Sequence, residues 1–98
     1  MKIGDLVYLK WEDSRGSPGG WVDIAHARTP QLATIQTVGW VMALSKAAVS
    51  VAPSIATIEG DGESTQGNLV IPLSGLLTSK RIKLPPNLGI LTRATPKV

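Results

Sequence analysis

The chain contains no cysteine, no phenylalanine and only one histidine among its 98 residues. The absence of cysteine excludes disulfides and thiolate chemistry. A zinc site needs three or four His, Cys or carboxylate ligands, which a single histidine without cysteine does not supply. Neither a metal nor a cofactor is therefore expected. Because aromatic residues are only 4% of the chain, the core must consist of aliphatic side chains and the three tryptophans.

Charge is also scarce, since charged residues make up 17% of the chain, below the roughly 25% that is typical of soluble domains. A small domain with so few charges has difficulty covering its surface with polar groups. We therefore expect an apolar self-association face and a homo-oligomer.

The net charge is +3 and the isoelectric point is near 9.6. Much of the basic excess lies in the last fifth of the chain, at Lys80, Arg81, Lys83, Arg93 and Lys97. A modest basic excess of this kind most often serves solubility, but it also occurs in proteins that bind nucleic acid or an anionic ligand.

No apolar run reaches the ~18–20 residues that a membrane-spanning helix requires. The N-terminus lacks the apolar stretch of a signal peptide. These two absences predict a cytoplasmic protein without membrane contact. The length predicts a single domain.

The stretch 34–52 is the most regular part of the chain. Residues 34–44 are rich in β-branched and apolar side chains on both faces of an expected strand, which suits a strand enclosed on two sides. The pattern resumes at 49–51 after a break at 45–48 that is long enough only for a turn. A β-hairpin is predicted, with the turn type open because neither Asn-Gly nor Asp-Gly is present.

The N-terminal part predicts a first strand over residues 6–11. Its alternation indicates that Val7, Leu9 and Trp11 face the core. Residues 12–20 contain glycines and a proline that predict a loop. Residues 21–28 show helical spacing over about two turns. We expect this short helical segment to place Trp21 and Ile24 over one end of the fold.

The remaining segments predict further strands and a tail. Pro53 ends the central hairpin and 55–58 is an expected edge strand, whereas the polar, glycine-rich 59–67 is an expected mobile loop. Strands are predicted over 68–73 and 79–84, separated by a turn with one 3₁₀ turn. The fold class is therefore all-β, a small SH3-like antiparallel β-barrel over residues 1–84, followed by a basic, proline-containing tail over 85–98.

Several short motifs of the chain resemble those of a widespread group of small phage and prophage proteins. The motifs are Trp11-Glu-Asp-Ser14 followed by Gly20-Trp21, then Thr37-Val-Gly-Trp-Val41, Val51-Ala-Pro-Ser54 and Val70-Ile-Pro72. The resemblance covers roughly residues 3–84, and the tail departs from it. It implies a phage-encoded small β-barrel and indicates little about activity.

The sequence offers no catalytic residues. His26 lies between two alanines, and Asp23 could reach it across one helical turn, but no serine is linked to either by a motif. Nucleophilic catalysis requires a base oriented by a third group. Asp61 and Glu63 lack the ligand spacing of a calcium loop. We therefore expect a protein that is not an enzyme.

A candidate ligand-binding cluster surrounds the first loop: Trp11, Asp13, Ser14, Arg15, Trp21 and Arg28. A planar ring could stack on an indole while an arginine pairs with phosphate or carboxylate. Alternatively, Asp13 and Ser14 only bond the loop backbone. On the last strand, Arg81 and Lys83 share a face that could follow phosphates, although it could equally be a solvated surface.

Three hypotheses follow. The first is a non-catalytic phage accessory protein that oligomerises and sequesters a small anionic ligand, such as a nucleotide immune signal, to counter host defence. The second is an SH3-like module that binds nucleic acid. The third is a structural or protein-docking phage component, which the apolar residues of the tail also suggest.

Overall fold

The computed structural model describes residues 1–14, 16, 20–58, 60 and 62–85. It is built almost entirely of strands, and the helical elements within these residues are one short α-helix and one 3₁₀ turn. In chain order the elements are β1 (Leu6–Asp13), α1 (Ile24–Ala27), β2 (Ala33–Leu44), β3 (Ala48–Ala52), β4 (Ser54–Ile58), β5 (Gly62–Gln66), β6 (Leu69–Pro72), the 3₁₀ turn η1 (Leu73–Gly75) and β7 (Leu76–Arg81). The predicted all-β class is confirmed.

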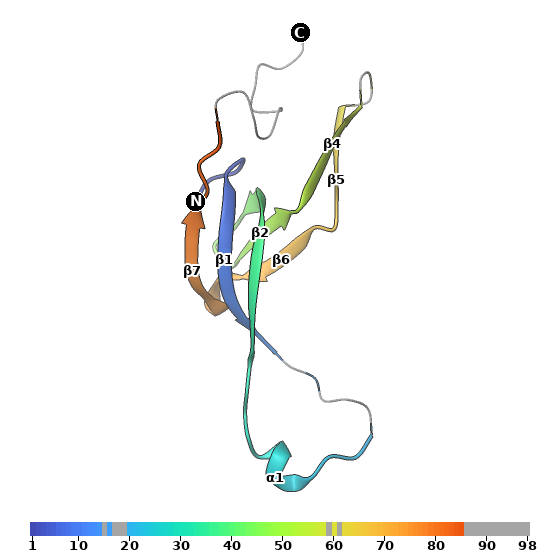
Figure 1. Cartoon of the computed structure of the whole chain (residues 1–98), viewed down its shortest axis with the longest axis vertical. Coiled ribbons are helices and arrows are strands. Elements are labelled where there is room, and N and C mark those ends of the chain that lie inside the picture. The colour runs from blue at the N-terminus through green and yellow to red at the C-terminus, as the bar shows by residue number, and fades with distance from the viewer. Residues whose placement is uncertain (15, 17–19, 59, 61, 86–98) are drawn as a thin grey trace.

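Five of the strands form one sheet in the order β6-β3-β2-β1-β7, and every neighbouring pair is antiparallel. The chain passes from β6 at one edge to β7 at the other through η1 (Figure 1). Bulges between Lys10 and Trp11 and between Val41 and Ala43 interrupt the register, and such bulges bend a sheet. Within the described residues no sheet closes on itself, so the expected closed barrel is not confirmed.

The core lies on one face of this sheet. Its buried members are Val7, Leu9, Trp11, Val41, Val49, Val51 and Ile71, with Ile35, Leu73 and Leu76 packed against them. Because successive side chains of a strand point to opposite faces, the alternation of β1 brings Val7, Leu9 and Trp11 inward together. This confirms the predicted core face of the first strand.

Among the described residues, no element forms a layer over the centre of the opposite face of the sheet. Val38, in the middle of β2, is 53% exposed, and Leu44 at the end of β2 is also exposed. The prediction that the strand over 34–44 is enclosed on both sides is therefore wrong. An apolar residue pattern shows which side chains could be buried, but not whether another layer exists to bury them.

Two glycines allow close approach of backbone segments. A Cβ atom added to Gly39 would lie 2.9 Å from the carbonyl oxygen of Ala52 on β3. A Cβ atom added to Gly75 would lie 2.5 Å from the carbonyl oxygen of Glu12. Gly75 therefore lets η1 rest directly on β1 where the chain crosses between the sheet edges.

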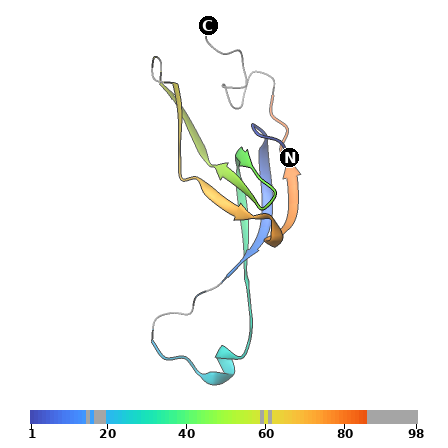
Figure 2. The ribbon, with the colours of Figure 1, turned by 180° about the vertical axis from the view of Figure 1, so that it is seen from behind.

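Strands β4 and β5 form a separate hairpin that projects from the sheet (Figures 1 and 2). The prediction of a loop throughout 59–67 is wrong, because residues 62–66 pair with β4, for example Ile55 with Thr65. Polar strands of this kind carry little hydrophobic signal. Similarly, the last strand spans Leu76–Arg81 rather than 79–84, because its pairing with β1 sets its ends.

The molecule is elongated, with extents of 62 × 25 × 24 Å. Its radius of gyration is 17.6 Å, against about 13 Å for a compact domain of this length. Residues 20–32, here called the arm, form the second part of the connection between β1 and β2. The arm lies beyond the end of the sheet opposite the β4–β5 hairpin (Figure 1).

Candidate functional site

The arm exposes its apolar side chains to solvent. Every one of its residues is exposed; Trp21 is fully exposed at 103%, and Ile24 is 65% exposed. None of the residues of α1 is buried. The prediction that this segment places Trp21 and Ile24 over one end of the fold is therefore wrong, because the arm extends away from the sheet (Figure 1).

Local hydrogen bonds define the short helix of the arm. The Arg28 N–H donates to the Ile24 carbonyl at 2.9 Å, and the Thr29 hydroxyl donates to the Ala25 carbonyl at 3.1 Å. Asp23 at the N-cap makes no side-chain capping bond. Because a helix of four residues is far below the length that is stable alone in water, a packing partner would strengthen the fold of the arm.

Trp11, one of the predicted ligand contacts, is a core residue. It is 3% exposed, and its indole Nε1 donates a hydrogen bond to the Thr37 hydroxyl at 3.1 Å. The ring is therefore enclosed and its polar atom is already paired. This placement corrects the hypothesis that Trp11 offers a surface on which a ligand ring could stack.

The other predicted contacts around the first loop are spread along it. The Ser14 N–H donates to Asp13 Oδ1 at 2.7 Å, which agrees with the alternative that Asp13 bonds the local backbone. Arg28 is exposed on the arm together with Trp21. Arg15 lies outside the described residues. Trp21 and Arg28 thus remain the members of the predicted cluster that solvent can reach on the arm.

The predicted basic pair of the last strand lies at its end rather than within it. Arg81 Nε lies 3.4 Å from Asp5 Oδ1 in an ion pair at the end of the sheet. Lys83 lies beyond the end of β7 and is exposed. The basic tail expected over 85–98 falls outside the described residues except for Pro85.

The uncovered face of the sheet presents a group of side chains that the sequence did not single out as a site. Tyr8, whose hydroxyl donates to Gln36 Oε1 at 2.9 Å, is flanked there by Lys10 on its own strand and by Lys80 on β7. The signal that could have found this group is the alternation of β1, which puts Tyr8 and Lys10 on the same face.

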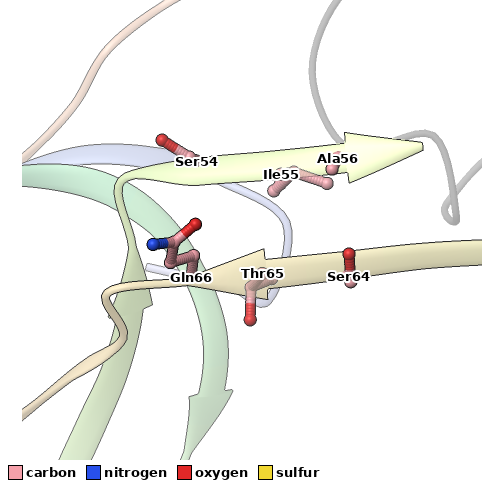
Figure 3. Close-up of a pocket in the computed structure, with 6 residues that line it drawn as sticks. All are labelled: Ser54, Ile55, Ala56, Ser64, Thr65 and Gln66. Atoms are coloured by element: carbon pink, nitrogen blue, oxygen red, sulfur yellow. The ribbon is translucent and has the colours of Figure 1, made fainter. Parts of the chain in front are cut away.

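A shallow hollow lies on the β4–β5 hairpin (Figure 3). It is lined by Ser54, Ile55, Ala56, Ser64, Thr65 and Gln66, and the side chain of Gln66 extends toward β4. Its volume of about 160 Å³ is smaller than the roughly 300–1,000 Å³ of typical ligand pockets. No ionisable side chain is among the described residues that line it, so this lining offers no cation for an anionic ligand.

The described residues include no group of three or more His, Cys, Asp or Glu that could hold a metal ion. No helix among them is long and apolar enough to cross a membrane. Comparison with protein-family models, curated proteins and solved structures gives no match to this chain. The resemblance to phage proteins therefore stays a prediction, and the functional argument depends on the molecule itself.

Proposed function

We propose that this chain is a non-catalytic docking module that self-associates by packing the arm of one copy against the body of another. The observation that carries the proposal is the complete exposure of Trp21 beside exposed Val22, Ile24 and Leu32. Burial of a large apolar side chain contributes about 1.5–3 kcal/mol, and tryptophan is prominent among the residues that dominate protein interfaces. A partner surface would supply that burial.

A second copy is the partner that the chemistry favours. The body of the chain exposes its own apolar side chains, among them Ile3, Val70 and Leu77. The arm carries Asp23 and Arg28, whose charges cancel, so it is not repelled by a body with a net positive charge. A reciprocal exchange of arms would form a closed two-fold dimer, the commonest type of homo-oligomer.

The test measures mass by light scattering over a series of protein concentrations. The native chain should be a dimer or larger oligomer that dissociates on dilution. Trp21→Ala should shift the mass to that of the monomer without lowering stability, since the Trp21 side chain is fully exposed and its truncation removes no buried surface. Leu44→Ala, which truncates an exposed apolar residue outside the arm, is the matched control. A monomeric native chain at every concentration contradicts the proposal.

A second candidate function is the capture of a small anionic ligand, as expected for a phage accessory protein that counters host defence. It is favoured by the exposure of Trp21 and Arg28 on the same arm, because an indole and a guanidinium together suit an aromatic anion such as a nucleotide. The walls of such a site would come from the second copy. Melting temperatures in the presence of a nucleotide panel test it: a rise that Arg28→Ala abolishes supports capture, and no rise with any nucleotide contradicts it.

The finer fold that we propose is an SH3-like open barrel. Two features support it, namely the strand order β6-β3-β2-β1-β7 and the 3₁₀ turn between β6 and β7. In this arrangement the sheet curls without joining its edges. Amide exchange of β6 and β7 tests this, because the outward N–H groups of two unjoined edges should exchange faster than those of the central strand β2.

A further inference from the structure

The outer sheet face is the face of the five-stranded sheet opposite the core, formed by Leu6, Tyr8, Lys10, Glu12, Gln36, Val38, Trp40, Thr78 and Lys80. It is open around Val38, whereas Trp40 at its end is half-buried. The register places them together, because Leu6 pairs with Trp40, Tyr8 pairs with both Val38 and Lys80, and Lys10 pairs with both Gln36 and Thr78. Residues that are directly opposite on neighbouring strands project on the same side of the sheet. The face therefore combines aromatic and aliphatic side chains with two lysines.

Tyr8 is held in a definite position at the middle of this face. Its hydroxyl reaches Gln36 Oε1 at 2.9 Å, whereas its directly opposite neighbour on β2 is Val38. The bond to a residue two positions away on the adjacent strand requires the ring to extend along the sheet rather than to project from it. Tyr8 is half-buried, so one part of its ring remains available to a ligand.

The charge around Tyr8 is positive. Lys80 is its cross-strand neighbour and Lys10 follows it by two residues on the same face, and both lysines are exposed. The acidic residues of the five strands are Glu12 and Asp13. Glu12 shares the face, two residues beyond Lys10 and four beyond Tyr8, at the end of β1 that leads to the arm. The single ion pair seen within the described residues joins Arg81 to Asp5 and leaves both lysines free of carboxylate partners.

We propose that the outer sheet face binds single-stranded nucleic acid, with a base stacked on Tyr8 and the backbone phosphates near Lys10 and Lys80. Aromatic rings beside cations on an open surface suit single strands, because stacking accepts every base and the charges follow the backbone. A duplex keeps its base faces covered and could use only the lysines. A free nucleotide would find no enclosing walls on this open face.

The experiment measures binding of fluorescein-labelled oligo-dT and oligo-U to the full chain by fluorescence anisotropy at several salt concentrations. Both single strands should bind, and more tightly than a duplex of the same length. Tyr8→Ala should weaken binding by about five-fold to about 150-fold, the range for loss of one base stack. Tyr8→Phe keeps the ring and should keep most of the affinity. The double variant Lys10→Ala/Lys80→Ala should reduce the salt slope by about 1.4.

Two variants serve as controls in the same assay. Lys46→Ala removes an exposed charge from the β2–β3 turn, outside the face, and should bind like the native chain. Trp21→Ala alters only the arm and should also retain binding, which separates this proposal from arm-mediated docking. The proposal is overturned if the native chain binds neither oligonucleotide at low salt, if the duplex binds as tightly as the single strands, or if Lys46→Ala or Trp21→Ala weakens binding as much as the face variants. Melting curves by circular dichroism identify any variant that fails to fold. If Tyr8→Ala does not fold, the binding of the double variant Lys10→Ala/Lys80→Ala decides the result.

Discussion

At the scale of single residues, the three tryptophans of the chain have three different environments. Trp11 is buried and hydrogen-bonded, Trp21 is fully exposed, and Trp40 is half-buried with an Nε1 atom that is enclosed without a hydrogen-bond partner. Strand alternation predicted the burial of Trp11. No comparable pattern indicates whether a loop tryptophan folds back onto the body, so the exposure of Trp21 could not be predicted from the sequence.

The bond between Trp11 and Thr37 leads to a stability prediction. Thr37→Val keeps the shape of the side chain but leaves the buried indole N–H unpaired, which should lower the free energy of unfolding by about 1–3 kcal/mol. Thr34→Val makes the same change at an exposed position of the same strand and should alter it by less than about 0.5 kcal/mol. Urea unfolding followed by circular dichroism measures both, and equal stabilities would show that the Trp11 bond contributes nothing.

The contact of Gly39 with β3 leads to a second prediction. Gly39→Ala would place Cβ 2.9 Å from the Ala52 carbonyl oxygen, so the two strands must separate and the free energy of unfolding should fall by about 1–3 kcal/mol. Gly16→Ala is the control, because nothing lies within 4 Å of the added atom. Thermal melting should lower the midpoint of the first variant only. A native midpoint for Gly39→Ala would contradict the close approach.

At the scale of elements, the strands rich in apolar or β-branched residues were predictable, and the polar strand β5 was not. β1, β2 and β3 match the expected strands closely. Alternation indicated β1, and the β-branched and apolar residues of 34–44 and 49–51 indicated β2 and β3. β5 was missed because the residues Gly62–Gln66 are polar and gain their strand conformation from pairing with β4. The spacing of residues 21–28 predicted about two helical turns, but α1 has only four residues. None of these residues is buried, so packing does not stabilise a longer helix.

Ser45 stabilises the turn between β2 and β3 through side-chain hydrogen bonds. The sequence had left the type of this turn open. Its hydroxyl oxygen accepts hydrogen bonds from the N–H groups of Ala47 and Ala48 at 3.1 and 3.0 Å. Ser45→Ala should therefore lower the free energy of unfolding by about 0.5–1.5 kcal/mol, whereas Ser45→Asp restores an acceptor and should recover most of the loss. Lys46→Ala in the same turn is the control. Urea titrations that rank Ser45→Ala with Lys46→Ala would contradict this role.

At the scale of the whole molecule, the sequence indicated one of the two candidate sites in part, through Trp21 and Arg28 of the arm, and did not indicate the outer sheet face. The predicted cluster around the first loop is divided between the core and the arm, because Trp11 belongs to a strand that alternates inward and Trp21 to a segment that leaves the sheet. The outer sheet face arises from three strands that are distant in sequence. Its assembly depends on register, which the sequence of any one strand does not determine.

Because the arm is exposed, limited proteolysis can measure whether a second copy covers it. Trypsin should cut the peptide bond after Arg28 rapidly in the dilute monomer, because the whole arm is exposed. As the protein concentration rises, a second copy should cover the arm and the rate constant for this cut should fall, since proteolysis follows the population of the accessible form. Cleavage after Lys83, outside the arm, provides an internal reference measured by mass spectrometry in the same samples. Trp21→Ala should keep the cut after Arg28 equally fast at every concentration; a native chain that behaves in the same way would show that no partner copy covers the arm.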